Sequence, residues 1–139
     1  MVSSKAKLQG QTKRQWFQID VANDTYGRVA SKIANLLRGK HKRNFLPQAD
    51  SGDFVVAINV DKLKFSGRKL KQKKYYRHSG FLGGLKSSTL QVEYQKNPDN
   101  VLRRAVYNML DDLRFRKALI ARLKLVEGPK HDFKIDKHL

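Results

Sequence analysis

The chain has 139 residues, with 30 Lys and Arg against 12 Asp and Glu, which gives a formal net charge of +18 at pH 7. Such a charge attracts polyanions, so nucleic acid is the first class of partner to consider and an anionic membrane surface the second. The absence of cysteine excludes disulfide scaffolds, cysteine nucleophiles and thiolate metal sites. No apolar run approaches the roughly 18 residues of a membrane-spanning helix, and the first residues lack the apolar core of a secretory signal.

The first part of the chain predicts a strand, a helix and a second strand. Residues 16–21 are aromatic and β-branched and favour a strand. Asn23–Gly27 offers helix caps followed by a glycine in the turn, and apolar residues then recur at helical spacing over 28–38. Gly39 is placed to end that helix. The continuous apolar run at 54–58 is typical of a parallel strand that is covered on both faces.

The middle of the chain predicts two short extended segments and a short helix. Lys64–Gly67 suggests a strand that ends in a turn. The two tyrosines of the segment Lys73–Arg77 favour an extended conformation there. Ser88, with Gln91 three positions later, resembles a capping box at the start of a short helix.

The remainder is predicted to be helical before a final strand. Asn97–Pro98 starts a helix whose apolar residues form two adjacent rows, and Asp111–Asp112 can cap another helix that runs to Leu123. Leu125–Val126 suggests a final strand. The order of elements predicts an α/β fold of three layers, in which helices flank a mainly parallel sheet of about four strands.

The strongest compositional feature is an acid-free, basic segment over residues 62–92. Tyr75, Tyr76, His78 and Phe81 lie among its cations, and such rings can stack on unpaired bases while Lys neutralises phosphates. The alternative interpretation is a solvated basic face in an already basic protein. The mixture of rings and cations favours RNA contact. The nine basic residues are Lys62, Lys64, Arg68, Lys69, Lys71, Lys73, Lys74, Arg77 and Lys86.

Other stretches give weaker chemical signals. The glycine-rich Gly80–Gly84 suits either a loop laid against a phosphate backbone or a plain turn, and the phosphate-loop pattern is absent. The junction Asp24–Arg28 has one glycine, so helix capping is favoured over nucleotide binding. His78 and Ser79 point to opposite faces of an extended segment, which disfavours catalysis. The four histidines lack metal-ligand spacing, so we predict no catalytic residue, no metal and no cofactor.

Several motifs occur together in a fixed order and spacing. The most specific are Tyr75–Gly80 and the Gly83–Lys86 that follows. The others are Trp16–Asp20, Gly27–Ala34, Leu37–Lys40, Pro47 and Asp50–Asn59. By these motifs, from about Trp16 to Lys130, the chain resembles the bacterial-type large-subunit ribosomal protein L13 family.

The resemblance implies an α/β fold without catalysis, binding to large-subunit ribosomal RNA and early entry into subunit assembly. It implies neighbouring large-subunit ribosomal proteins as partners, no membrane, no small-molecule substrate, and a place in ribosomes of the cytoplasm or of an organellar matrix. Arg38–Arg43 and Tyr75–Lys86 match the RNA-contacting segments of the family. The predicted RNA-binding residues are Arg28, Arg38, Lys40, Lys42, Arg43, Lys64, Arg68, Lys69, Lys71, Lys73, Lys74, Tyr76, Arg77, His78, Ser79, Gly80, Gly83, Gly84, Lys86, Arg114 and Arg116.

The chain departs from the family pattern at three places. The family usually has proline at the position of Leu82, proline and lysine at Asp111–Asp112, and glycine at Arg116. We expect the two acids to cap a helix and not to face phosphate, because carboxylates stabilise helix N-termini. Arg114, Arg116 and Lys117 supply basic side chains nearby.

Two other functions stay open from the sequence. The same basic surface would serve a translational regulator that binds messenger RNA away from the ribosome. An α/β sheet could also carry a phosphate-handling enzyme, although neither a paired acid and base nor a full glycine-rich fingerprint is visible. In each case we expect a basic N-terminal tail at 1–14, a single domain at 15–130 and a charged C-terminal tail at 131–139.

Overall fold

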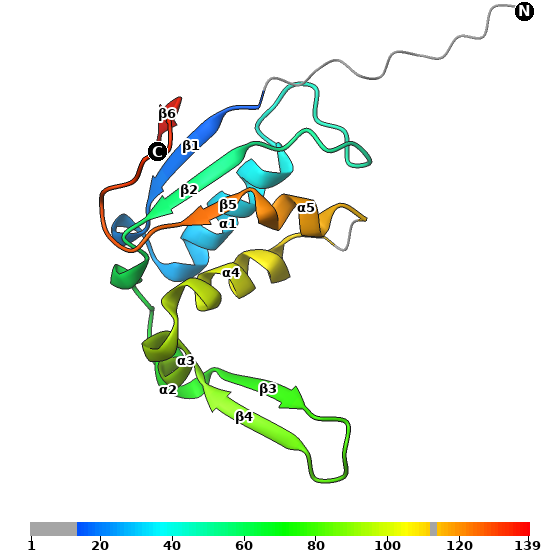
Figure 1. Ribbon diagram of the computed structural model, residues 1–139, viewed down its shortest axis with the longest axis vertical. Helices are drawn as coiled ribbons and strands as arrows, with labels where there is room; N and C mark the ends of the chain where they lie inside the picture. The colour runs from blue at the N-terminus through cyan, green and yellow to red at the C-terminus, as the bar shows by residue number, and fades with distance from the viewer. Residues whose placement is uncertain (1–13, 112–113) are drawn as a thin grey trace, which may run out of the picture.

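The computed structural model describes residues 14–111 and 114–139. Its strands are β1 (Trp16–Asp20), β2 (Phe54–Ile58), β3 (Lys74–His78), β4 (Leu85–Thr89), β5 (Leu123–Leu125) and β6 (Lys137–His138). Its α-helices are α1 (Tyr26–Arg38), α2 (Lys69–Gln72), α3 (Leu90–Lys96), α4 (Pro98–Met109) and α5 (Arg116–Ala121). Four strands form a parallel sheet in the order β5-β2-β1-β6, and β3 and β4 form a separate antiparallel hairpin (Figure 1). The predicted α/β fold with a mainly parallel sheet is confirmed.

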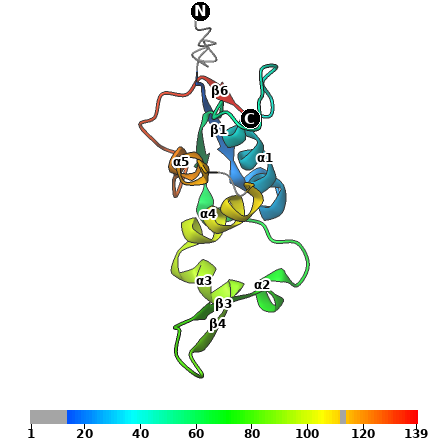
Figure 2. The ribbon, with the colours of Figure 1, turned by 90° about the vertical axis from the view of Figure 1, so that its right-hand side faces the viewer.

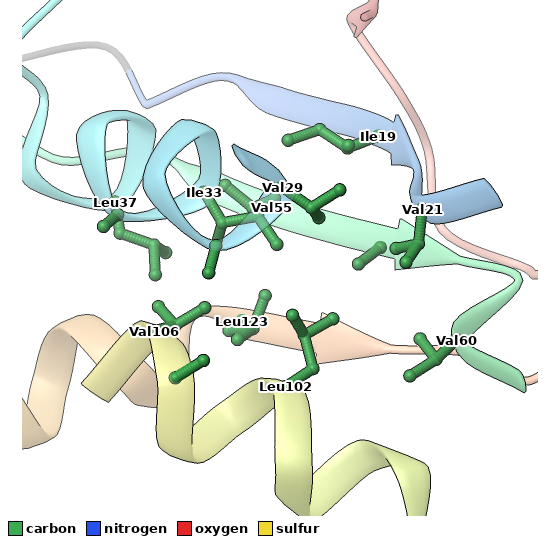
Figure 3. Packing of buried hydrophobic residues seen from close by; sticks show 14 of the residues in the cluster. Ile19, Val21, Val29, Ile33, Leu37, Val55, Val60, Leu102, Val106 and Leu123 are labelled. Carbon is green, nitrogen blue, oxygen red and sulfur yellow. The ribbon is translucent and has the colours of Figure 1, made fainter. Parts of the chain in front are cut away.

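The hydrophobic core lies between one face of the parallel sheet and the helices (Figure 3). Ile33 of α1, Val55 of β2 and Leu102 of α4 are fully buried in one cluster, to which α5 adds Leu119. The apolar rows that the sequence shows on α1 and α4 therefore face the core, except at the end of α4, where Met109 is exposed. Burying one such side chain stabilises the fold by about 1.5–3 kcal/mol relative to leaving it in water.

The second face of the sheet is also covered. Val55 and Val56 follow each other in β2 and neither is exposed, so both faces are shielded there, as the continuous apolar run predicts. On the second face Trp16 stacks on Phe54 with 4.4 Å between ring centroids, and on Phe133 with 5.7 Å. The chain after Phe133 ends in β6, which pairs with β1. The residues expected as a charged C-terminal tail thus lie along the sheet.

Helix α1 begins earlier than predicted and ends where predicted. It starts at Tyr26, so Gly27 lies in its first turn and not in the turn before it. Thr25 occupies the N-cap position without a capping hydrogen bond from its side chain. At the other end Gly39 has a φ of +81°, and its amide donates to carbonyls of the last helical turn. This left-handed conformation ends helices and favours glycine.

Between β2 and the hairpin one prediction is wrong and one is confirmed. Lys64–Gly67 is not a strand, because Lys64 forms only an isolated bridge to Thr25 before the chain turns. The short helix α2 then follows and is absent from the predicted elements. The extended segment predicted at Lys73–Arg77 is confirmed as β3.

The predicted capping box at Ser88 is also wrong. Ser88 belongs to β4, and its hydroxyl donates to the Glu93 carboxylate at 2.6 Å. Gln91 makes no reciprocal contact with it, since α3 begins only at Leu90 with Thr89 at the N-cap. A helix follows as predicted, but the strand that precedes it is set by pairing with β3 and not by a local signal.

The fourth helix begins as predicted, whereas Asp111, the first of the two acids after it, acts differently from the prediction. The Asn97 side chain accepts a hydrogen bond from the Asn100 amide at 3.1 Å, which confirms the predicted cap of α4. Asp111 does not cap α5, which begins beyond it; its carboxylate pairs with Arg38. Asp112 lies outside the described residues.

Candidate nucleic-acid interface

A groove of about 690 Å³ lies between the β3–β4 hairpin and helices α3 and α4. The hairpin projects from the body of the molecule beside these helices (Figure 1, Figure 2). Arg77 and Lys86 line the groove from the hairpin, and Lys96 and Arg104 line it from the helices. Among the described residues of its lining, Glu93 is the only acid. The groove therefore carries a positive charge that suits a polyanion.

Strand pairing explains which side chains face the groove. In the antiparallel register Tyr75 lies opposite Ser88, and Arg77 lies opposite Lys86. Because alternate residues of a strand share a face, these four side chains lie on one side of the hairpin. Arg77 and Lys86 are thus like charges in directly opposed positions. The repulsion between two such charges destabilises the strand pair, and a bound anion reduces that repulsion.

Two contacts organise the interior of the groove. The Cζ atom of Arg104 lies 4.5 Å from the centroid of the Tyr75 ring, which stacks the guanidinium on the aromatic face. The hydrogen bond from Ser88 engages the Glu93 carboxylate within the groove wall. The four cations of the lining are exposed. The groove thus offers positive groups to a ligand while its one acid already has a partner.

The opposite face of the hairpin carries further predicted residues. Lys74, Tyr76 and His78 alternate with Tyr75 and Arg77 and are exposed, Tyr76 by 66%, and Tyr76 also contributes to the groove lining. Leu85 lies opposite His78 on this face. An exposed ring next to cations provides a platform on which a base can stack.

The tip of the hairpin is a glycine-dependent turn over Ser79–Gly84. Gly80 and Gly83 have φ angles of +89° and +72°, which side chains disfavour. The Gly80 amide donates to Nδ1 of His78 at 2.9 Å, so this ring nitrogen takes part in the turn. Phe81 is 78% exposed at the tip. The tip is thus a turn that presents an exposed aromatic ring, and contact between this loop and a phosphate backbone stays a prediction.

Three basic residues near the groove were missed by sequence reasoning: Lys96, Arg103 and Arg104. Arg103 and Arg104 also line a second hollow of about 350 Å³ beside Tyr107. Arg116, one of the predicted RNA-binding residues, lies next to this hollow, since its Cζ is 4.4 Å from the Tyr107 ring centroid. The two arginines could have been found from the sequence. The helical period that places the apolar rows of α4 in the core also places Arg103 and Arg104 on its outer face.

The basic loop after α1 is organised by a buried carboxylate. Asp53 has no exposed surface and accepts a hydrogen bond from Nζ of Lys42 at 2.6 Å. Nε2 of His41 lies 2.9 Å from the other carboxylate oxygen, and the Lys42 amine also donates to the Ser51 carbonyl. The Lys42 side chain is only 15% exposed. Its amine is thus engaged inside the loop, whereas Lys40 and Arg43 are exposed.

Arg38 is likewise engaged within the chain. Its guanidinium pairs with Asp111, and its Cζ lies 5.6 Å from the Phe45 ring centroid. The Arg38 side chain is 15% exposed. Asp111, which stands where the family usually has proline, therefore pairs with Arg38, a residue that the resemblance predicts to contact RNA.

The other predicted residues are exposed outside the groove lining. Arg28 lies on α1 and Arg114 precedes α5. The exposed cations around α2, next to the base of the hairpin, are Lys64, Arg68, Lys69, Lys71 and Lys73. The structure thus brings the hairpin residues together with α3 and α4, and it leaves Arg28 and the 38–43 loop outside the groove.

The described residues also bear on metal binding and on membrane insertion. No group of three or more His, Cys, Asp or Glu side chains among them could hold a metal ion. None of the helices in this part of the chain is long and apolar enough to cross a membrane.

Comparison with known proteins gives a consistent result. A family model described as Ribosomal protein L13 matches residues 14–132. The chain is 48% identical to the large ribosomal subunit protein uL13 of Lawsonia intracellularis over 117 residues, which is 84% of this chain and 81% of that protein. It is 44% identical to the protein of the same name from a Roseiflexus species over 126 residues, 91% of this chain and 86% of the relative. The chain belongs to the ribosomal protein L13 family.

Proposed function

We propose that this structural, non-enzymatic protein binds large-subunit ribosomal RNA through the groove and the outer face of the β3–β4 hairpin, with Lys40 and Arg43 of the exposed loop after α1 adding phosphate contacts. Its membership of the L13 family and the names of its relatives support a place in the large ribosomal subunit. Its partners are then ribosomal RNA and neighbouring large-subunit proteins, within the ribosomes of the cytoplasm. Early entry into subunit assembly belongs to the same proposal, in which residues 15–130 supply the RNA-binding surface.

The observation that carries the proposal is the opposed pair Arg77 and Lys86. Directly opposite like charges repel each other across a strand pair, so their register favours the binding of a phosphate between them. Lys96 and Arg104 extend the positive surface on the facing helices. Binding by such a surface depends on phosphate neutralisation. If about six phosphates are neutralised, the logarithm of the binding constant falls with the logarithm of salt concentration at a slope of roughly −4 to −5.

A double charge reversal tests the role of the groove. Arg77→Glu with Lys86→Glu should weaken binding to a large-subunit ribosomal RNA fragment by more than tenfold and reduce the salt slope by about 2, since each phosphate contact contributes about 1. The matched control is Lys130→Glu with Lys134→Glu, two exposed positions outside the groove lining with the same change in net charge.

The control decides between a local and a global effect. Equal losses in the two double variants would show that net charge, and not the groove, binds the RNA. A changed circular-dichroism spectrum in the groove variant would show that these side chains support the fold. A flat response of the wild-type protein to salt would contradict the proposed function itself.

A further inference from the structure

We infer that the groove takes a single unpaired nucleotide of RNA, whose base stacks on Arg104 and whose flanking phosphates lie against the cations of the hairpin. This inference rests on the proposed function and specifies the kind of RNA that the groove recognises. It concerns the groove alone and does not involve the exposed cations around α2.

The size and shape of the groove favour a single nucleotide. Its volume of about 690 Å³ lies within the roughly 300–1,000 Å³ of sites that enclose small ligands. The hollow is recessed between a hairpin and two helices, and Tyr75 and Arg104 lie within it. A duplex presents its phosphates on a broad outer surface, and its bases are stacked within it. A nucleotide that leaves the stack can enter such a recess with its base.

Arg104 is suited to receive that base. Its guanidinium is held against the Tyr75 ring at 4.5 Å, yet the residue is exposed and also lines the second hollow beside Tyr107. One side of the planar group is thus fixed by protein while surface remains for a ligand. Bases that are unpaired stack on guanidinium planes as well as on aromatic rings. Because the plane is already positioned, less side-chain freedom is lost when the base binds.

The Tyr75 ring is itself firmly placed. Tyr75 is partly buried and packs against the hydrophobic core, and Nζ of Lys73 lies 5.5 Å from its ring centroid. A ring anchored in this way gives Arg104 a stable support. Lysine at the position of Arg104 would keep the charge but has no planar group to stack. The charge and the plane can therefore be separated by one substitution.

The cations next to this platform can hold the phosphates on either side of the nucleotide. Arg77 and Lys86 form the opposed pair on the hairpin, and Lys96 lies across the groove on α3. Phosphates on both sides of an extruded nucleotide approach each other more closely than in an extended strand. A recess with cations on two walls matches that arrangement and neutralises both charges.

The test uses the full chain and two labelled RNA stem-loops that differ in one nucleotide. One stem is fully paired, and the other carries a single bulged 2-aminopurine, whose fluorescence reports stacking. We expect the wild-type protein to bind the bulged RNA at least about fivefold more tightly, the lower end of what stacking of one base contributes. We also expect the 2-aminopurine fluorescence to change on binding.

Three variants separate stacking from charge. Arg104→Lys should remove the preference for the bulge and the fluorescence change while leaving affinity for the paired stem near that of wild type. Arg68→Lys, at an exposed arginine outside the groove lining, should keep both signals. Tyr75→Phe retains the supporting ring and should also keep them. Circular dichroism checks that each variant is folded.

The outcomes distinguish this inference from the proposed function. Equal wild-type affinity for the two stems, or an unchanged preference in Arg104→Lys, would overturn the inference while RNA binding stands. A failure to bind either RNA would instead contradict the proposed function. Loss of the preference in Arg68→Lys to the same extent as in Arg104→Lys would show that the effect does not arise in the groove, and would also overturn the inference.

Discussion

Replacing Lys42 by Met separates a structural role from an RNA-binding role in the basic loop. The Lys42 amine lies 2.6 Å from the fully buried Asp53 carboxylate, and its side chain is 15% exposed. Met retains the apolar stem of Lys42 but leaves the Asp53 charge without its closest cation. From this geometry we expect Lys42→Met to reduce stability and to leave phosphate contacts largely unchanged.

The structure sets the size of the effect. Removing one partner of a buried ion pair costs about 3–5 kcal/mol, because the remaining charge stays buried. Asp53 keeps the Gln15 amide at 2.9 Å and His41 at 2.9 Å, so the lower end applies. We therefore expect a loss of about 3 kcal/mol. With a typical urea dependence for a small protein, the unfolding midpoint should fall by roughly 1–3 M.

Urea unfolding followed by circular dichroism measures this loss, and the salt dependence of RNA binding measures the other role. The matched control is Lys40→Met in the same loop, where the side chain is exposed. This control should change stability by less than about 0.5 kcal/mol and reduce the salt slope by about 1. A Lys42→Met variant with unchanged stability and a reduced slope would show that Lys42 faces phosphate, and would refute the structural role.

Three further substitutions test the close packing at Gly52, the burial of Tyr26 and the ion pair of Asp111. A Cβ at Gly52 would lie 1.6 Å from the Leu37 carbonyl oxygen, so Gly52→Ala should destabilise by about 3 kcal/mol, and an unchanged urea midpoint would contradict that close approach. Burial raises the pKa of Tyr26, so the unfolded state loses the phenol proton at a lower pH than the folded state does. The free energy of unfolding should therefore fall as the pH rises above about 10. Tyr26→Phe should lessen this fall, and parallel profiles of stability against pH for the two proteins would contradict the raised pKa. Asp111→Asn should free Arg38 for RNA and steepen the salt slope by about 1, with an identical slope showing that the ion pair does not limit binding.

The elements that the sequence predicts correctly have local signals. Burial can be predicted from the apolar run of β2 and from the apolar rows of α1 and α4. The start of α4 can be predicted because the Asn97 side chain caps the helix that follows it directly. Strand β4, with the sequence Leu-Lys-Ser-Ser-Thr, has no such pattern because much of it is exposed. Its conformation comes from pairing with β3, and that of β6 comes from pairing with β1. Such pairings depend on the fold as a whole.

The same distinction applies to the candidate site. The cations of the hairpin could be found because they lie in one acid-free segment of the sequence, whereas Lys96 and Arg104 reach the groove from α3 and α4 through tertiary packing. Composition also cannot show that a cation is already engaged. Arg38 and Lys42 look like their neighbours in the sequence, and only the positions of Asp111 and Asp53 reveal their internal partners.

The central claim is that the protein binds ribosomal RNA as a stable part of the large subunit. Sedimentation of ribosomes through a high-salt sucrose gradient tests it most directly, with the protein detected across the fractions. We predict that it stays with the large subunit, because stacking on bases and contacts with neighbouring proteins persist when salt weakens the phosphate contacts. Release of the protein into the light fractions would contradict the claim.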